Sequence, residues 1–205
     1  MKSIAFLSQK GGSGKTTLAV HTAVTAQESG ENVVVIDTDP QQSAMTWAAA
    51  RTTDIPPVAA INANEIQKVF EAAQNEEMTL AIVDTAPHAA PEASVIAAKV
   101  DLIAIPVRPS AFDIAAVGNA VEIAKAAKTR TVFVLSACPF RSPEIAETRE
   151  LLKTYQLPIA PMDITERRAF SRAVASGRAV TEFESDGKAA AEIRALWQWL
   201  KGEMQ

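Results

Sequence analysis

The chain has 205 residues, of which 48% are hydrophobic and 21% charged, a composition typical of one soluble globular domain over residues 1–205. Its single cysteine, Cys138, excludes an intramolecular disulfide, a cysteine-based metal cluster and a redox CxxC pair. The formal net charge is −4, so any binding of nucleic acid would have to come from a local basic patch.

Apolar runs of strand length alternate with longer helical patterns along the chain. The predicted strands are Ser3–Ser8, Asn32–Ile36, Val58–Ile61, Leu80–Val83, Leu102–Val107, Thr131–Ala137 and Pro158–Met162. The predicted helices include Thr16–Ser29, Ala63–Gln74 and Ala111–Lys128. Continuously apolar strands suit a parallel sheet that is covered on both faces. The alternation therefore predicts an α/β fold: a doubly wound, mostly parallel sheet whose ligands bind beyond the carboxyl ends of the strands.

A glycine-rich loop follows the first predicted strand and leads directly into the first predicted helix. It runs from Lys10 to Thr17 and reads KGGSGKTT. The glycines let successive N–H groups point at one anion, and the helix N-terminus adds unpaired N–H groups. In such a loop the Lys15 ammonium reaches the β- and γ-phosphates, and the Thr16 hydroxyl binds Mg²⁺. The sequence therefore predicts a P-loop nucleotide-binding domain with Mg²⁺ as its metal.

The loop departs from the general P-loop pattern, because Gln9 stands where that pattern has its first glycine and Lys10 follows. The string K-G-G-x-G-K-[ST]-T resembles the deviant Walker A motif of the ParA/MinD family of ATPases. In that family the early lysine reaches the phosphates bound by a partner subunit, so the resemblance implies an ATP-dependent homodimer. It also implies catalytic roles for Lys10 and Lys15. The nucleotide-binding residues that it implies in the loop are Lys10, Gly11, Gly12, Ser13, Gly14, Lys15, Thr16 and Thr17.

Three aspartates follow predicted strands. Asp37 and Asp39 belong to the string DTDPQ, and Asp84 ends the run that begins at Leu80. By the same resemblance, Asp39 is the catalytic residue that orients or activates the attacking water, and Asp37 and Asp84 join Thr16 at Mg²⁺ or its water shell. Phosphoryl transfer needs mainly positioning and charge neutralisation, which these residues can supply. The alternative is that Asp37 and Asp39 cap the next helix.

Two residues near the expected site carry weaker signals. His88 follows Asp84 closely, and we expect an exposed loop residue there and not a general base. In relatives, a proline-containing segment similar to 106–110 lies close to the nucleotide, so the resemblance adds Pro106 to the nucleotide-binding residues. Taken alone, the proline predicts only a rigid loop.

The C-terminal segment Ala189–Leu200 has apolar residues at helical spacing. MinD-like proteins end in an amphipathic helix that binds membrane. Here the cations of the polar face, Arg194 and Lys201, are offset by Glu192 and Glu203, so anionic lipid would gain little. We therefore expect this helix to pack against the domain's own sheet, without stable membrane association, in a cytoplasmic protein.

A cation-rich segment precedes that helix. Its arginines are Arg167, Arg168, Arg172 and Arg178. The segment resembles the C-terminal region of ParA proteins, whose basic residues contribute to non-specific DNA binding, and four arginines can contact backbone phosphates. The alternative is a solvated helix face that Glu166 partly neutralises.

The resemblance implies a small ParA-type partition ATPase without an N-terminal helix-turn-helix domain. Such a protein would bind ATP and nucleoid DNA, hydrolyse ATP slowly, respond to a ParB-type partner and drive plasmid or chromosome segregation. One alternative is the positioning of a protein cargo, such as a chemoreceptor cluster or a microcompartment. Others are a MinD-like membrane-associated regulator and a small-molecule synthetase of the same fold.

Overall fold

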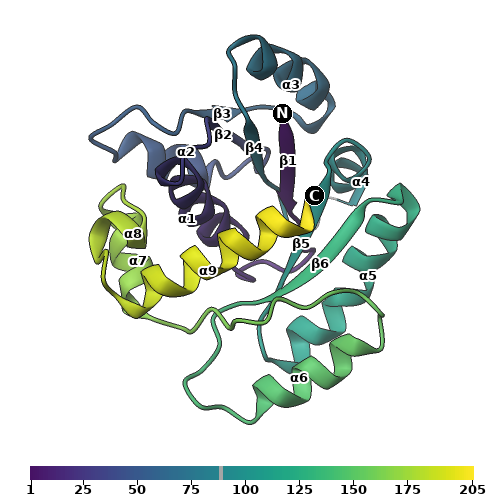
Figure 1. Ribbon diagram of the computed structural model, residues 1–205. Coiled ribbons are helices and arrows are strands. Elements are labelled where there is room, and N and C mark those ends of the chain that lie inside the picture. The colour runs from purple at the N-terminus through teal and green to yellow at the C-terminus, as the bar shows by residue number, and fades with distance from the viewer. Residues whose placement is uncertain (88–89) are drawn as a thin grey trace.

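A six-stranded sheet forms the centre of the computed structural model, which describes residues 1–87 and 90–205 (Figure 1). The strands lie in the order β3-β2-β4-β1-β5-β6, and every neighbouring pair is parallel. Their bounds are β1 (Lys2–Phe6), β2 (Val33–Asp37), β3 (Val58–Ala60), β4 (Leu80–Asp84), β5 (Leu102–Val107) and β6 (Arg130–Leu135). The arrangement confirms the predicted α/β fold with a doubly wound parallel sheet.

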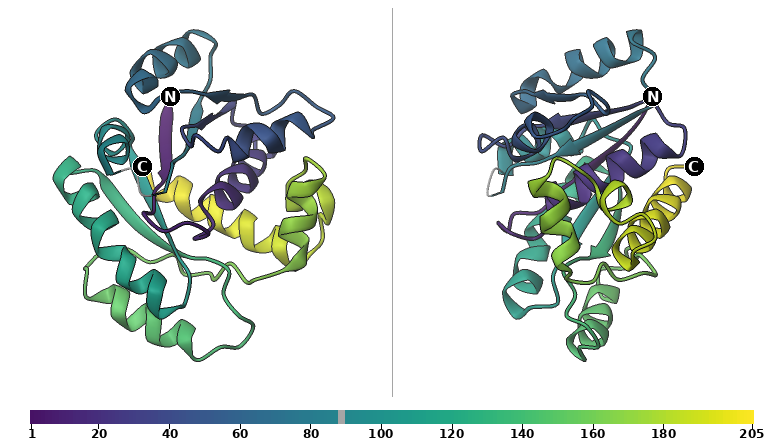
Figure 2. Two further views of the ribbon diagram at one scale, coloured as in Figure 1. Left: turned by 180° about the vertical axis from the view of Figure 1, so that it is seen from behind. Right: turned by 90° about the vertical axis from the view of Figure 1, so that its left-hand side faces the viewer.

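Helices cover both faces of this sheet (Figure 2). One face carries α1 (Lys15–Glu28), α2 (Ser43–Ala49), α7 (Arg168–Ala175), α8 (Val180–Phe183) and α9 (Lys188–Glu203). The other face carries the 3-10 turn η1 (Ala63–Glu65), α3 (Ile66–Asn75), α4 (Ala90–Ala97), α5 (Ala111–Ala127) and α6 (Glu144–Lys153). Successive strand residues point to opposite faces, so Val35 packs in one core and Ile36 in the other. This explains why the strands are continuously apolar.

One predicted strand, Pro158–Met162, is not a strand in the structure. The segment meets β6 at a single bridge, between Phe133 and Ile159, and the Ala160 N–H donates to the Phe133 carbonyl at 2.8 Å. Beyond Ala160, the Leu135 carbonyl of β6 accepts the Ile164 N–H at 3.0 Å, so the regular ladder does not continue through residues 161–163. The segment therefore covers the edge of β6 without extending the sheet.

The C-terminal helix α9 lies across α1 in front of the sheet (Figure 1). Its apolar side chains are buried: Ile193, Leu196, Trp197 and Leu200. The Trp197 indole N–H also donates to the Ser29 hydroxyl at 2.7 Å, just beyond the end of α1. The expectation that this helix packs against its own domain is confirmed. Across the described part of the chain, every helix is too short or too polar to span a bilayer.

Candidate functional site

The carboxyl ends of three neighbouring strands bring the predicted site residues together. Asp84, the last residue of β4, is the register partner of Phe6 at the end of β1 and of Asp37 at the end of β2. The glycine loop connects β1 to Lys15, the first residue of α1. Ligands of doubly wound sheets bind beyond this edge. The loop and the aspartates therefore lie where the fold places a ligand.

The loop from Lys10 to Thr17 has the backbone of an anion-binding turn. Gly12 and Gly14 have φ angles of 75° and 99°, in the left-handed region that favours glycine. A Cβ atom at Gly12 would meet no atom of the described residues within 4 Å, so this side of the loop is open toward them. Behind the loop, the Ser136 hydroxyl donates to the Ser13 carbonyl at 2.6 Å. The loop is thus anchored on one side and leaves room for a phosphate group on the other.

The two lysines of the loop have different surroundings. Lys15 is buried, and its ammonium group donates to the Lys10 carbonyl at 3.3 Å. Burial lowers the pKa of Lys15, and the carboxylates of Asp84 and Asp39 oppose this effect. The Lys10 side chain is half-buried and forms no ion pair with a residue that the structure describes. Lys15 therefore belongs to the interior of the site and Lys10 to its rim.

Asp84 is buried, and neither carboxylate oxygen has a hydrogen-bond partner among the described residues. Burial raises the pKa of Asp84 to about 7; the nearby Thr16 hydroxyl and Lys15 ammonium oppose the rise, and Asp37 and Asp39 add to it. A buried carboxylate without partners is costly unless a proton or a cation satisfies it.

The donor set around Asp84 fits Mg²⁺ bound together with a nucleotide. No three His, Cys, Asp or Glu side chains within residues 1–87 and 90–205 form a metal-binding group. A cation here would therefore need phosphate and water oxygens besides Asp84 and the Thr16 hydroxyl. Mg²⁺ commonly binds in this way, through one or two protein oxygens, substrate phosphates and several waters.

Asp37 holds the start of α2. Its Oδ2 accepts the N–H groups of Ala44 at 2.9 Å and Met45 at 3.2 Å, and its Oδ1 accepts the Asp39 N–H at 3.0 Å. Burial raises the pKa of Asp37, and the three N–H groups oppose the rise. Asp37 therefore caps α2, as the alternative proposed. A role of Asp37 in binding Mg²⁺ stays a prediction. The half-buried Asp39 instead accepts the Gln41 N–H at 2.9 Å within a turn.

The predicted strand Leu102–Val107 is confirmed as β5, so Pro106 and Val107 lie in the strand and the loop begins at Arg108. Pro106 is buried and is the register partner of Val134. Arg108 is the residue that reaches the glycine loop, since its guanidinium donates to the Gly12 carbonyl at 3.4 Å. A nucleotide contact of Pro106 stays a prediction. His88 lies outside the described residues.

A cavity of about 560 Å³ opens beside the glycine loop. Gly12, Gly14 and Thr17 line it on one side, and the apolar side chains of Ile164 and Phe170 line it on another. A volume of this order suits a small-molecule ligand with an apolar body and a polar end. Sequence reasoning missed this wall, because nothing in the sequence indicates that residues 164–175 return to the loop.

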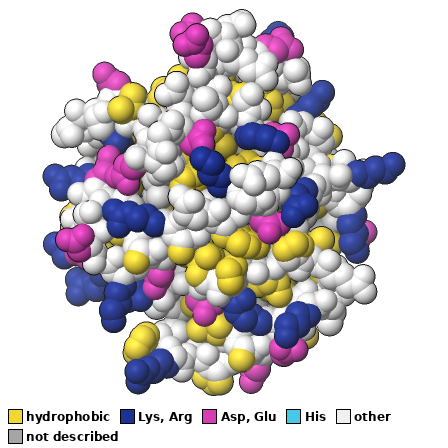
Figure 3. Space-filling view, viewed as in Figure 1, with side chains coloured by type: hydrophobic (Ala, Val, Ile, Leu, Met, Phe, Trp, Pro, Cys, Tyr) yellow, Lys and Arg dark blue, Asp and Glu magenta, His cyan; other side chains and the backbone are white. Residues whose placement is uncertain are grey.

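The predicted DNA-binding arginines are not equivalent. Arg168, Arg172 and Arg178 are exposed, whereas Arg167 is paired with Glu192 at 2.7 Å. A groove of about 420 Å³ lies between α7 and α9, and four of its lining residues are basic. The full lining is Arg167, Arg168, Ala169, Arg172, Glu184, Lys188 and Ala189. Lys188, which the predicted set omitted, therefore joins the patch. Lys and Arg side chains gather over α7 and α8 at the left of Figure 3.

Comparisons with known proteins agree with this geometry. A family model described as an AAA domain (AAA_31) matches residues 1–114, more than half of the chain. The chain is 29% identical over 206 residues to the maintenance of carboxysome distribution protein A of Gloeobacter kilaueensis, covering 98% of this chain and 93% of that protein. It is 27% identical over 181 residues to protein ParA of Rhizobium radiobacter, covering 83% of this chain and 81% of that protein.

A solved structure shares the fold. The septum site-determining protein MinD of Pyrococcus horikoshii, complexed with Mg-ADP, matches with a TM-score of 0.78 at 14% identity, covering 97% of this chain and 95% of that one. Fold, glycine loop and family match lead to the same assignment. The chain belongs to this AAA-domain family, as a member of the ParA/MinD group of ATPases.

Proposed function

We propose that this chain is a ParA-type ATPase that binds ATP with Mg²⁺, forms a homodimer in that state and then binds DNA non-specifically. The observation that carries the proposal is the group formed by Lys15, Thr16 and Asp84 beside an open glycine loop; the Asp84 carboxylate has no hydrogen-bond partner within residues 1–87 and 90–205. A cation and a phosphate chain would satisfy all of these groups at once. The relatives that share the family support the same assignment.

Different residues of the site would bind different parts of the nucleotide. The N–H groups of the loop and of the first turn of α1 would receive phosphate oxygens. Lys15 would exchange its bond to the Lys10 carbonyl for a phosphate, and Thr16 with Asp84 would hold Mg²⁺ or its waters. The nucleoside would occupy the cavity that Ile164 and Phe170 line, which has the required size and an apolar wall.

Hydrolysis of ATP to ADP and phosphate needs a positioned water and charge neutralisation. Asp39 is half-buried beside the loop, and its carboxylate would orient the water. Lys10, which has no ion pair among the described residues, would neutralise charge on the partner subunit's nucleotide. ATP hydrolysis should be slow when a residue of the partner subunit is needed to complete the site. We therefore expect weak basal ATPase activity and stimulation by a ParB-type partner.

The basic groove between α7 and α9 is the proposed contact with DNA and would place the ATP state on the nucleoid. Arg168, Arg172 and Lys188 are exposed there, with Glu184 as the acidic neighbour in the groove. Contacts to backbone phosphates give affinity without sequence preference and a strong dependence on salt. A dimer would present two such grooves and strengthen binding through avidity.

The segregation of a plasmid or chromosome is the first candidate for what this cycle moves. The similarity to a maintenance of carboxysome distribution protein specifically favours a second candidate, a protein assembly as cargo. Both candidates use the same ATPase and the same DNA contact. They differ in the partner that stimulates hydrolysis, a centromere-binding protein in the first case and an adaptor on the assembly in the second.

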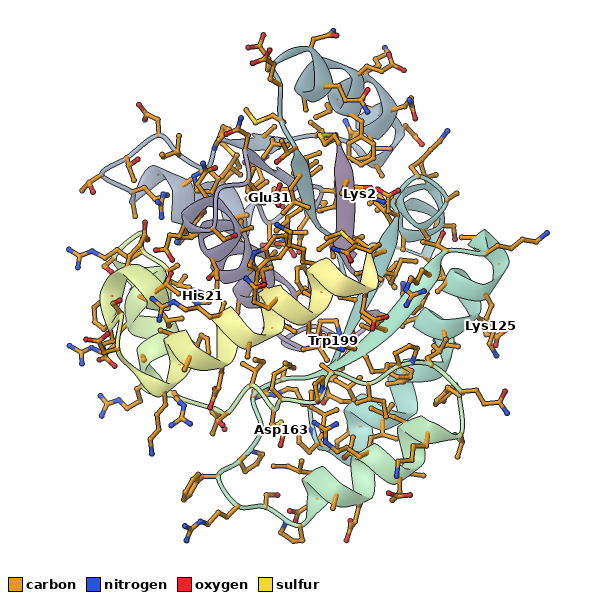
Figure 4. The ribbon with its side chains drawn as sticks, in the orientation of Figure 1. Lys2, His21, Glu31, Lys125, Asp163 and Trp199 are labelled. Atoms are coloured by element: carbon orange, nitrogen blue, oxygen red, sulfur yellow. The ribbon has the colours of Figure 1, made fainter. Side chains whose placement is uncertain are left out.

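Fluorescence anisotropy with a mixed-sequence DNA duplex tests the DNA step. We expect binding with Mg-ATP and not with Mg-ADP, and a fall in log affinity that is linear in log salt concentration. Arg172→Ala or Lys188→Ala should each weaken binding and reduce the salt slope by about 1. Lys125→Ala, on α5 far from the groove, is the matched control (Figure 4). Binding that ignores the nucleotide or both groove variants would exclude the proposed DNA contact.

A further inference from the structure

The C-terminal end of α2 is fastened to the turn between α7 and α8. The Trp47 indole N–H donates to the Arg178 carbonyl at 3.1 Å, and the Arg51 guanidinium donates to the Gly177 carbonyl at 2.9 Å. Arg51 also binds both carboxylate oxygens of Glu182, at 2.8 Å and 3.1 Å. The turn that carries Arg178, one of the predicted DNA-binding residues, is therefore held by two side chains of a distant segment.

The contacts of Trp47 and Arg51 with the α7–α8 turn are closely packed. The Arg51 side chain is 3% exposed and its guanidinium lies over the Trp47 ring, 4.6 Å from the ring centre. Gly177 has a φ of 67°, and a Cβ atom there would lie 2.3 Å from the Ala50 carbonyl group. Two backbones in such close contact cannot move independently. A displacement of α2 must therefore shift the turn or break this contact.

The Glu182 carboxylate also accepts a backbone N–H at the start of α8. Glu182 Oε2, which accepts a bond from Arg51, accepts the Ala179 N–H at 2.7 Å. One residue thus links the guanidinium to the first turn of the helix that follows Arg178. Loss of the Arg51 contact would also loosen the start of α8.

The other end of α2 is held by the nucleotide site. Asp37 caps its first turn through Ala44 and Met45, and Asp37 also accepts the N–H of Asp39. Because α2 spans only Ser43–Ala49, its two ends belong to one short rigid unit. A change in the backbone around Asp39 would be carried along α2 to Trp47.

A second tie reaches the turn from the helix of the glycine loop. His21, in the interior of α1, accepts the Val180 N–H through Nδ1 at 3.1 Å. Its ring also meets Phe170 of α7 edge-on, with 5.1 Å between ring centroids. Figure 4 places His21 where α1 meets α7 and α8. Both helices that begin at the nucleotide site therefore contact the base of the basic patch.

We propose that Trp47 and Arg51 are positioning residues that transmit the nucleotide state around Asp39 to the α7–α8 turn and so to the basic groove. The inference rests on the proposed function, since it explains how ATP would change DNA affinity. The competing explanation is that the contacts only stabilise the fold. The two explanations differ in whether the turn responds to the nucleotide.

Hydrogen exchange and DNA binding of the full-length protein test this inference together. Exchange of the amides of 176–184 is measured with Mg-ADP and with Mg-ATP, and DNA affinity is measured in the same two states. Trp47→Phe removes the indole donor and keeps an aromatic ring, and Glu182→Gln removes the charge that Arg51 binds. Matched controls are Trp199→Phe on α9 and Glu203→Gln, which removes the charge paired with Arg130.

The wild type is expected to change exchange at 176–184 between the two nucleotides. In Trp47→Phe this change should be lost, and the ratio of DNA affinities in ATP and ADP should fall about tenfold while nucleotide affinity and dimerisation persist. Wild-type behaviour of Trp47→Phe in both readouts would overturn the inference, as would a turn that never responds to nucleotide. If Glu182→Gln fails to fold, the results for Trp47→Phe alone still test the inference.

The two proposals can fail separately. If the wild type does not bind DNA in any nucleotide state, the proposed DNA contact is wrong, and the exchange at 176–184 still reports whether Trp47 transmits the nucleotide state. If the wild type binds DNA only with ATP and Trp47→Phe does the same with an unchanged exchange pattern, only the inference is wrong.

Discussion

Asp37 and Asp84 are register partners at the carboxyl ends of neighbouring strands, yet among the described residues only the Asp37 carboxylate has hydrogen-bond partners. Three backbone N–H groups bind Asp37 and offset part of the cost of burying its charge, although burial still raises its pKa. Asp84 has none of this support among the described residues, and it depends on a proton or a cation. Two adjacent aspartates therefore have opposite effects on the stability of the protein without nucleotide.

Replacement of Asp84 should stabilise the nucleotide-free protein. The folded-state pKa is about 7, above the ordinary value of 3.8, so the unfolded chain releases its proton first and stability falls as pH rises from 4 to 7. Asp84→Asn should therefore raise the free energy of unfolding at pH 8, by up to about 4 kcal/mol, with little effect at pH 4. Urea unfolding measures this difference. The added stabilisation by Mg-ATP should be lost in the variant; an unchanged gain would contradict the assigned role.

Replacement of Asp37, in contrast, should destabilise the nucleotide-free protein. Asp37→Ala leaves the buried N–H of Ala44 without an acceptor and removes the support for the first turn of α2. Loss of such a cap costs about 1 kcal/mol, and more when the orphaned donor is buried. Urea unfolding of the nucleotide-free variant should show this loss. Equal or greater stability than the wild type would mean that the cap is unimportant.

His21 should make the protein sensitive to acid. It is fully buried, and burial lowers its pKa from 6.5 to about 3. As pH falls, the unfolded chain binds a proton at His21 before the folded protein does. The free energy of unfolding is therefore unaffected by His21 above pH 6.5 and decreases as pH falls toward 3, by about 2 kcal/mol at pH 5. His21→Gln keeps an acceptor for the Val180 N–H and cannot titrate. The loss of unfolding free energy between pH 7 and pH 5 should be smaller in this variant by that amount, and identical pH profiles would argue against a neutral buried ring.

Two glycines with positive φ should respond differently to alanine. Gly177→Ala forces a Cβ atom against the Ala50 backbone, 2.3 Å away, and should cost about 3 kcal/mol or more. Gly30→Ala, at a φ of 96° with no atom within 4 Å, has only the left-handed strain of about 1 kcal/mol. Thermal unfolding of both variants gives the comparison. Similar losses would mean that α2 and the α7–α8 turn are not closely packed.

The meeting of the candidate nucleotide-binding residues at one edge of the sheet could be predicted because its signals are local. A strand that runs into KGGSGKTT and strands that end in Asp37 and Asp84 place their residues at one edge of a parallel sheet. The walls of the adjacent cavity could not be predicted, since Ile164 and Phe170 reach the loop only through the path of the chain after β6. The predicted strand Pro158–Met162 is wrong for the same reason, because this segment meets β6 only at the bridge between Phe133 and Ile159.

The basic patch shows the same limit. Four arginines in sequence indicated one cationic surface, but Arg167 is paired with Glu192, which lies 25 residues further along on α9. The contacts of Trp47 and Arg51 with the α7–α8 turn span 126 residues or more. No spacing rule connects positions that far apart, so pairing and coupling of this kind emerge only from the tertiary structure.

Size-exclusion chromatography with light scattering on Asp39→Ala tests the central claim most directly, because loss of the carboxylate that we propose orients the water should preserve bound ATP. The variant should be a dimer with Mg-ATP and a monomer with Mg-ADP. Adding Lys10→Ala should return it to a monomer that still binds ATP, since only the contact across the interface is removed. An Asp39→Ala protein that binds ATP and stays monomeric, or a Lys10→Ala double variant that still dimerises, would contradict the account.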